Sequence, residues 1–189
     1  MYKICQTEQS IRRQRELEQG LLRVMGKRNY EDLTVKDLCD EMALPRKSFY
    51  RYFSSKDGAL YALIDHTMMD FKHDPGILFG NTMQDVAQDV LHFFTFWQQK
   101  RPLLDALERS GLSGVLVERA ITQAQNEFVP PRNPVKPEVR AMYYHTITFA
   151  ICGLMSMVTR WHRSDYAESA AEMAQIATTL LTRPLVGEK

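Results

Sequence analysis

Residues 33–56 read LTVKDLCDEMALPRKSFYRYFSSK, and this stretch decides how the chain folds. Thr34 is followed three positions later by Asp37, a spacing that predicts a capping box at a helix start. Apolar residues then recur at helical intervals from Val35 to Met42. The first half of the stretch is therefore expected to form a helix of about two turns that depends on packing for its stability.

The second half of the stretch begins with a break at Ala43-Leu44-Pro45. Pro45 disfavours helix for the residue before it and suits the start of the next helix. That helix is expected from about Arg46 to Phe53, with Phe49 and Phe53 on its buried side. Its other side chains are mostly cationic or carry hydroxyl groups. Two short helices around a tight turn, the second one basic, are typical of a helix-turn-helix.

The pattern over about residues 10–65 resembles the DNA-binding domain of TetR-family transcriptional regulators. The most specific part is the Tyr50-Arg51-Tyr52-Phe53 group, followed by Ser55-Lys56-Asp57 and then an apolar helix. Three positions depart from the family. Ala43 and Asn29 stand where the family usually has Gly, and Pro45 stands where it usually has Ser. An alanine at a turn that favours positive φ is expected to be strained.

The resemblance implies roles for individual residues when they are transferred position by position. Those implied to face base edges are Arg46, Lys47, Ser48 and Tyr52. Those implied to hold phosphates are Thr34, Tyr50 and Lys56, with Arg51 on the same DNA-binding surface. Base contacts by Arg or Lys would supply most of the sequence discrimination, at about 1–3 kcal/mol for each good contact, whereas phosphate contacts fix register.

Charge is distributed unevenly along the 189 residues, although the net charge is only +1. Residues 1–56 hold 12 Lys/Arg against 8 Asp/Glu, and residues 57–189 hold 12 against 15. The positive segment is the one expected to meet DNA. The cluster of Arg12, Arg13 and Arg15 either contacts phosphates or forms a solvated helix face.

The remaining sequence predicts an all-α protein in which a larger helical domain, residues 57–189, follows a three-helix domain, residues 1–56. Helices are expected at about 7–28, 56–72, 82–100, 103–109, 112–128, 137–163 and 166–181, with a proline-rich loop at 129–137. No run of eighteen apolar residues exists, so no membrane contact is expected. Without a signal-peptide pattern, a cytoplasmic location is expected.

An unusually aromatic cluster, Phe93-Phe94 and Phe96-Trp97, has two interpretations. These side chains either fill the core or line a pocket for a small apolar or aromatic effector. If a pocket exists, its expected residues are Phe93, Phe94, Trp97, Leu116, Tyr144 and Phe149. No cofactor is expected.

The last two helices carry apolar and small residues that suit close helix packing. In the resembled family two such helices from each subunit form the dimer interface, and paired recognition helices suit a palindromic operator. The residues expected at this interface are Leu154, Met155, Val158, Trp161, Met173, Ile176, Ala177 and Leu180. The alternative is that both helices only close the core of one subunit.

No arrangement of residues typical of catalysis is present. The five histidines lack zinc-site spacing, the three cysteines share no metal-like spacing, and phosphate- or dinucleotide-binding glycine motifs are absent. An enzyme is therefore not expected. The sequence predicts a DNA-binding transcriptional regulator, and the resemblance implies a repressor under effector control. The alternative is a TetR-like regulator that acts as an activator and whose C-terminal domain senses a partner protein or only dimerises.

Overall fold

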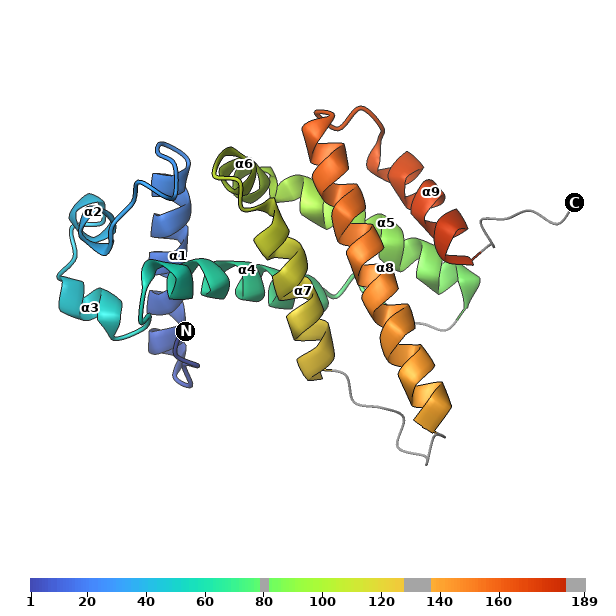
Figure 1. Ribbon diagram of the computed structural model, residues 1–189, viewed down its shortest axis with the longest axis horizontal. Helices are drawn as coiled ribbons and strands as arrows, with labels where there is room; N and C mark the ends of the chain where they lie inside the picture. Colours follow the sequence, from blue (N-terminus) through green and yellow to red (C-terminus); the bar gives the residue numbers. More distant parts are fainter. Residues whose placement is uncertain (79–81, 128–136, 183–189) are drawn as a thin grey trace, which may run out of the picture. The chain divides into compact units, whose positions relative to one another are not determined.

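The computed structural model describes residues 1–78, 82–127 and 137–182, and helices account for nearly all of their regular structure (Figure 1). The helices are α1 (Glu8–Met25), α2 (Val35–Glu41), α3 (Arg46–Tyr50), α4 (Lys56–Lys72), α5 (Met83–Gln99), α6 (Arg101–Arg109), α7 (Ser113–Glu127), α8 (Pro137–Arg163) and α9 (Ala170–Thr182). Within the described residues, β pairing is limited to one isolated bridge between Tyr2 and Phe53. The all-α fold predicted from the sequence is confirmed.

The chain divides into two units by packing. The first contains residues 1–68 and 102–114, and the second contains residues 69–101 and 115–189. Most of α4 thus belongs to the first unit, which contains its residues 56–68. The functional division at residue 56 stays a prediction. Residues 129–136 of the expected proline-rich loop lie outside the described residues.

The first unit is built around apolar side chains from α1 to α4, where α1 contacts α2 and α2 contacts α3. The largest buried ones are Leu21, Met25, Leu33, Leu38, Phe49, Phe53, Leu60, Leu63 and Ile64. A hydrogen bond joins α1 to α4, with 2.8 Å between His66 Nδ1 and Oε1 of the buried Glu18. Burial of these faces holds α2 and α3, which are too short to be stable alone.

The capping box predicted at the start of α2 is present. The Asp37 amide donates to the Thr34 hydroxyl over 3.1 Å, and the Thr34 amide donates to the Asp37 carboxylate over 2.9 Å. These bonds satisfy two amides that a helix start would leave without intrahelical partners.

The turn between α2 and α3 is a Schellman motif with alanine in its left-handed position. Ala43 has φ 49°; its amide donates to Asp40, and the Leu44 amide donates to the Cys39 carbonyl over 2.9 Å. This is the helix-ending position at which glycine is preferred, because glycine has no Cβ to clash. The strain expected at Ala43 from the sequence is therefore found in the backbone.

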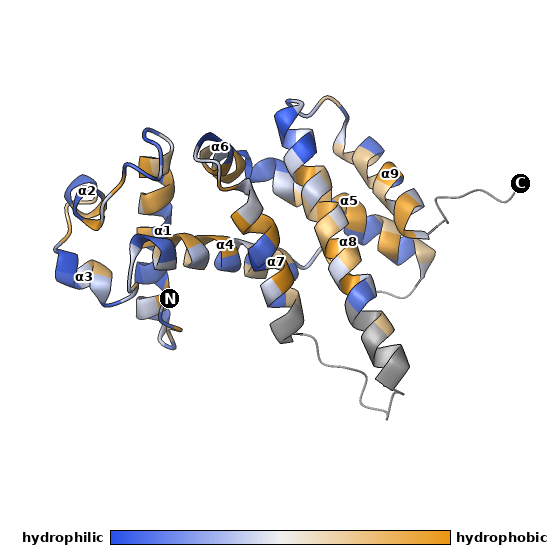
Figure 2. Cartoon of the chain, in the orientation of Figure 1, coloured by the Kyte–Doolittle hydropathy of each residue, from blue (hydrophilic) through white to orange (hydrophobic). Residues whose placement is uncertain are grey.

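The second unit has an aromatic core in which α5 packs against α8 and α9. Phe94 and Trp161 meet edge to face with 5.6 Å between ring centroids, and Phe93 lies 5.3 Å from Phe94. Figure 2 shows apolar residues along the middle of α8 and on α9. None of the helices in the described ranges has the length and apolar character needed to cross a membrane.

Replacing Ala43 with glycine should stabilise the protein by about 1 kcal/mol, because the strain of a left-handed alanine that it removes exceeds the backbone-entropy penalty that glycine adds. Thermal or urea unfolding measures the change. Ala87→Gly in the interior of α5 is the matched control and should destabilise, since its backbone is helical. Destabilisation by both substitutions would contradict the strain at Ala43.

Candidate nucleic-acid interface

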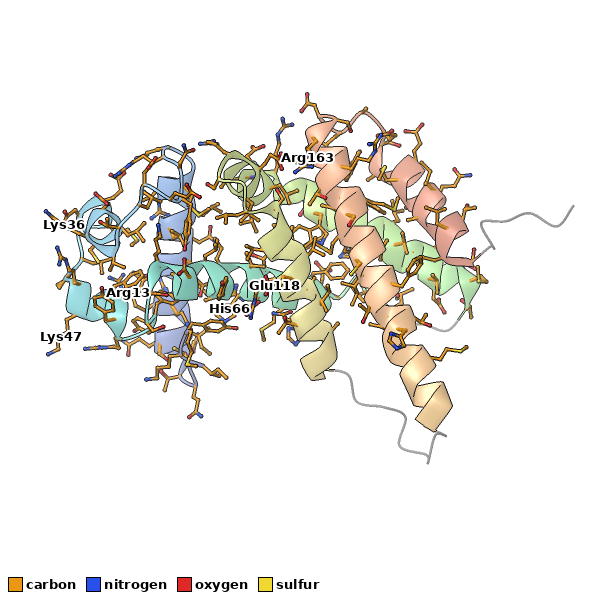
Figure 3. The ribbon with its side chains drawn as sticks, viewed as in Figure 1. Arg13, Lys36, Lys47, His66, Glu118 and Arg163 are labelled. Atoms are coloured by element: carbon orange, nitrogen blue, oxygen red, sulfur yellow. The ribbon has the colours of Figure 1, made fainter. Side chains whose placement is uncertain are left out.

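The two sides of α3 and of the turn that follows it, residues 46–53, differ sharply in burial and chemistry. Phe49 and Phe53 are 0% and 1% exposed and lie 5.2 Å apart between ring centroids. The outward residues Arg46, Lys47 and Arg51 are exposed. Figure 3 shows Lys47 projecting from α3 away from its neighbours. The buried pair therefore fixes which side of the helix presents cations to solvent.

The hydroxyl-bearing residues of the same segment are less uniform. Tyr50 is 54% exposed, whereas Ser48 and Tyr52 are half-buried. α3 ends at Tyr50, three residues before the end expected from the sequence, and a turn carries the chain on through Tyr52. The Tyr52 and Phe53 amides donate to the Phe49 carbonyl over 3.0 and 3.1 Å. The roles of Ser48 and Tyr52 toward bases stay predictions.

Pro45 occupies the N-cap of α3 and supplies no side-chain hydrogen bond there. Its φ of −66° and ψ of 139° are those of an extended residue that leads into a helix. The departure from the family's usual serine thus removes a capping hydroxyl and leaves the helix start intact.

Thr34, the residue expected at a phosphate, uses its hydroxyl within the protein. The hydroxyl donates to the Asp37 carboxylate and accepts from the Asp37 amide. The hydrogen bond from the Thr34 side chain is the main reason that the pKa of Asp37 is lowered to about 2. Asp37 therefore stays ionised at the start of α2, where the helix dipole also favours negative charge.

Lys56 is held by protein carbonyls. Its ammonium donates to Tyr30 O over 2.7 Å, Leu33 O over 2.8 Å and Glu31 O over 3.2 Å. The same nitrogen lies 4.4 Å from the centroid of the Tyr30 ring. An ammonium has three N–H donors, and all three have acceptors here. The geometry therefore favours a structural role for Lys56 over the phosphate contact implied by the resemblance.

The loop that Lys56 holds also contains a buried tyrosine. The Tyr30 hydroxyl donates to Asp57 Oδ1 over 2.6 Å, and burial with this hydrogen bond raises its pKa. Ser110 accepts from the Tyr30 amide over 3.2 Å, and Arg109 donates to the Met25 carbonyl at the end of α1. The α1–α2 loop is thereby fixed from both α4 and the end of α6.

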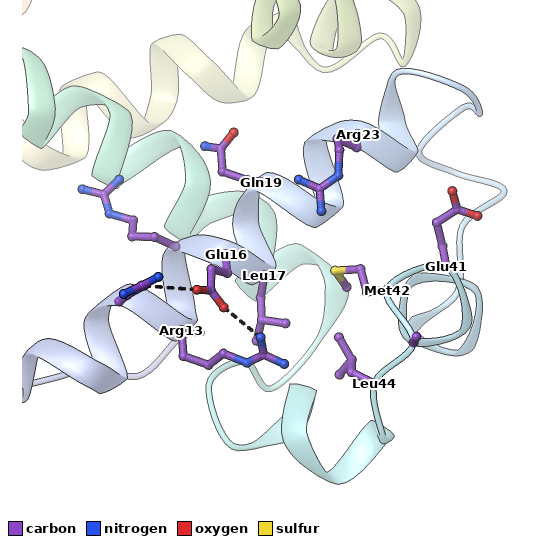
Figure 4. A pocket seen from close by; sticks show the side chains of 11 residues that line it. Arg13, Glu16, Leu17, Gln19, Arg23, Glu41, Met42 and Leu44 are labelled. Atoms are coloured by element: carbon purple, nitrogen blue, oxygen red, sulfur yellow. Dashed lines mark hydrogen bonds and ion pairs between the residues drawn. The ribbon is translucent and has the colours of Figure 1, made fainter.

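An arginine-rich groove lies between α1 and the α2–α3 turn (Figure 4). It has a volume of about 640 Å³. Its lining residues are Arg12, Arg13, Arg15, Glu16, Leu17, Gln19, Arg23, Glu41, Met42, Ala43 and Leu44. Arg12 and Arg13 both pair with Glu16, at 3.4 and 2.8 Å, and the hydrogen bond from Arg13 is the main cause of a lowered Glu16 pKa.

A second depression, of about 600 Å³, adjoins the end of α3. Its cationic lining comes from Lys3, Arg12, Arg13 and Arg51, with Glu16 again beside them. Exposed ion pairs such as these contribute little to stability, so the arginines can exchange Glu16 for another anion at small cost. The surface is suited to the phosphates of a nucleic acid.

Sequence reasoning missed two exposed cations on this side of the first unit. Lys36 projects from α2 (Figure 3), and Lys3 lines the second depression. The outward face of α2 could have indicated Lys36, because its helical position follows from the apolar pattern. Nothing in the sequence around Lys3 indicates the bridge between residues 2 and 53 that places it here.

The residues expected around an effector are only partly together. Phe93, Phe94, Trp97 and Leu116 are buried. Phe149 is 70% exposed and lines an apolar groove between α8 and α9 that includes none of these four residues. Its role in an effector pocket stays a prediction. The side chain of Tyr144 lies outside the described residues.

The residues expected at a dimer interface fall into two groups. Met155, Val158, Trp161, Met173 and Ala177 are buried within their own unit, and their place in a dimer interface stays a prediction. Of the other expected residues, Leu154 and Leu180 line an apolar groove between α8 and α9, and Ile176 is exposed. The full lining of this groove is Phe149, Ala150, Gly153, Leu154, Met157, Ala177, Leu180 and Leu181. Helical periodicity explains the split, because residues 155 and 158 face away from residues 149, 153 and 157.

Over the described part of the chain, no group of three or more His, Cys, Asp or Glu residues is placed to hold a metal ion. The three cysteines are unpaired thiols. Cys39 is buried, and burial raises the pKa of its thiol.

Comparison with known proteins agrees with this geometry. The sequence profile of the bacterial regulatory proteins of the tetR family matches residues 19–63. No curated protein matches the chain. The solved structure of the dihydroxyacetone kinase operon activator DhaS is 11% identical, with 90% of this chain and 94% of that one covered and a TM-score of 0.55. The fatty acid degradation regulator FadR from Bacillus halodurans is 13% identical, with 96% and 98% covered and a TM-score of 0.59. At such identities these two structures establish a shared fold.

Lys56→Ala should destabilise the protein by about 2 kcal/mol, because three carbonyls lose a charged donor and Tyr30 loses its cation. Lys47→Ala is the matched control: its side chain is exposed, so stability should stay within about 0.5 kcal/mol of the parent. Urea unfolding followed by circular dichroism measures both. Equal stability of the two variants would refute the structural role of Lys56.

Proposed function

We propose that this chain, which belongs to the tetR family of bacterial regulatory proteins by its residues 19–63, represses transcription as a homodimer bound to a palindromic operator. In this role it works in the cytoplasm, has no enzymatic activity and needs no cofactor. Its DNA binding is controlled through the second unit by a small apolar or aromatic effector.

The observation that carries the DNA-binding part is the division of residues 46–53, which comprise α3 and the turn after it, into a buried phenylalanine pair and an exposed cationic face. In a helix-turn-helix the second helix enters the major groove and reads base edges. Arg46 and Lys47 lie near the start of α3, where a recognition helix contacts bases, and either can donate to guanine. Tyr50 and Arg51 follow on the exposed side.

The grooves beside α1 extend the proposed interface. Arg12 and Arg13 would hold the DNA backbone, which favours the phosphate-contacting interpretation of this cluster over that of a solvated face. Their pairing with Glu16 is compatible with this role, since a phosphate can replace a weakly bound carboxylate.

The proposed interface predicts opposite effects at two exposed positions. Lys47→Ala should weaken binding to duplex DNA and reduce the slope of log K against log salt by about 1, because one phosphate or base partner is lost. Glu16→Gln should strengthen binding several-fold, because it removes an anion beside the arginines. Fluorescence anisotropy at several salt concentrations measures both.

The control for these variants is Glu118→Gln on α7, which removes an exposed carboxylate from the second unit. It should leave the salt slope of DNA binding unchanged. DNA affinities that do not respond to substitution at either Lys47 or Glu16 would rule out the proposed interface.

Homodimerisation is proposed from the apolar face that α8 and α9 leave uncovered. Phe149, Ile176 and Leu180 are 70%, 46% and 43% exposed. The groove beside them is almost entirely apolar, and monomeric proteins rarely expose such a continuous patch. A second copy of the same face would cover it with matching chemistry through a two-fold axis.

The double substitution Ile176→Glu with Leu180→Glu should convert the dimer to a monomer, because it would place like charges in an apolar interface. Sedimentation velocity measures the change. Affinity for a palindromic duplex should fall at least tenfold, since one recognition helix then binds alone. Gln175→Glu adds a charge at a neighbouring exposed position and should leave the dimer intact. Sedimentation of the parent protein as a monomer would contradict the proposed homodimer.

The packed rings of Phe93, Phe94 and Trp97 favour a second candidate for control of DNA binding. The ring centroid of Phe93 lies 5.3 Å from that of Phe94 and 6.4 Å from that of Trp97, so the rings pack against one another and leave no space for a ligand between them. In that case the second unit senses a partner protein or only dimerises. A rise in thermal stability with an apolar or aromatic compound favours effector control, and its absence across a broad set favours the second candidate.

A further inference from the structure

Residues 1–3 form a short extended segment that is paired with the end of the recognition helix. The Lys3 amide donates to the Tyr52 carbonyl over 2.9 Å. The Met1 carbonyl accepts from the Ser54 amide over 3.1 Å and from the Ser54 hydroxyl over 2.7 Å. Tyr2 and Phe53 form the antiparallel bridge between them.

The same segment is anchored to α4 through the side chain of Tyr2. Its hydroxyl donates to Asp65 Oδ2 over 2.7 Å, and Asp65 is only 1% exposed. The Tyr2 ring meets the His66 ring edge on with 5.5 Å between centroids. His66, labelled on α4 in Figure 3, is the residue whose Nδ1 contacts the buried Glu18 of α1.

A third anchor comes from α1. Gln14 is 2% exposed, and its side-chain amide donates to the Lys3 carbonyl over 2.9 Å. Burying a glutamine without a partner is unfavourable, so this bond accounts for a polar side chain in the interior. The segment therefore touches α1, α4 and the residues that follow α3.

Gly58 makes room for this arrangement. A Cβ at this position would lie 2.3 Å from the Met1 carbonyl oxygen and 3.0 Å from its carbon. Backbone atoms cannot move aside as a flexible side chain can. Glycine is otherwise a poor choice in the first turns of α4, where alanine forms helix better.

The end of α3 depends on outside support. α3 contains five residues and has no side-chain N-cap. Beyond Tyr50 the chain turns, and Tyr52 and Ser54 make the backbone hydrogen bonds described above to residues 1–3. Arg51 and Tyr52 lie in this part of the chain, so their placement follows that of the segment.

We propose that residues 1–3 are a clip that positions the end of the recognition helix for specific DNA, with Tyr2 as the positioning residue. The clip ties Tyr52 and Ser54 to α1 and α4 by a route that does not pass through α2. It also holds Lys3 beside Arg51 on the proposed DNA-binding side. This inference rests on the proposed function.

The test compares the parent chain with Tyr2→Phe, which removes the donor to Asp65, and Gly58→Ala, which displaces Met1. Ile4→Ala is the matched control, because Ile4 follows the clip directly and its side chain is 83% exposed. The parent selects a duplex from a random DNA pool, and all four proteins are titrated with that duplex and with a scrambled one. Amide exchange of Lys3 and Ser54 reports directly on the clip.

Both clip variants should bind the selected duplex about tenfold more weakly and the scrambled duplex as the parent does, because charge is unchanged. In Gly58→Ala the Lys3 and Ser54 amides should lose protection while far-ultraviolet circular dichroism stays the same. Ile4→Ala should match the parent throughout. A uniform loss of binding to both duplexes would indicate a general structural defect and overturn the clip.

Failure of the clip and failure of the proposed function give different results. If the parent and both clip variants bind a selected duplex equally, the clip is overturned and the proposed function stands. The same holds if Gly58→Ala leaves the two amides protected. If the parent selects no duplex at all, the proposed function fails and the clip falls with it.

Discussion

The burial of Phe49 and Phe53 is the constraint on which the first unit depends. A helix of five residues cannot hold its own orientation. Two aromatic rings, packed against one another and sealed in the core, fix its rotation. Once that rotation is set, the solvent-facing side is the only one left for Arg46, Lys47 and Arg51. A basic surface thereby becomes available to DNA.

Support for this helix comes from several directions, and polar contacts supply much of it. The Schellman turn at Ala43 sets its approach, residues 1–3 hold its end, and Lys56 fixes the α1–α2 loop through three carbonyls. Each of these contacts is short in distance, and those of Lys3 and Lys56 join residues far apart in the sequence. Together they make the placement of α3 depend on α1 and α4, which are the longer helices of the unit.

Much of the fold could be predicted because its signals are local. The Thr34 capping box, the buried face of α3 and the strain at Ala43 all follow from spacing within a few residues. The roles of individual site residues are harder to predict from the sequence where they depend on partners far along the chain. The family resemblance implies a phosphate contact for Lys56, and only the fold brings its ammonium to the carbonyls of Tyr30, Glu31 and Leu33. Phe149 belongs with an aromatic set by composition, but helical phase turns it outward.

The central claim is that the exposed face of α3 reads DNA sequence, and one measurement tests it most directly. Duplex selection from a random pool is carried out in parallel with the parent and with Arg46→Ala. We predict that the parent enriches a palindrome and that the variant keeps it but loses preference at one or two base pairs in each half-site, at about 1–3 kcal/mol for each lost contact. An identical consensus from both proteins, or none from the parent, would contradict the account.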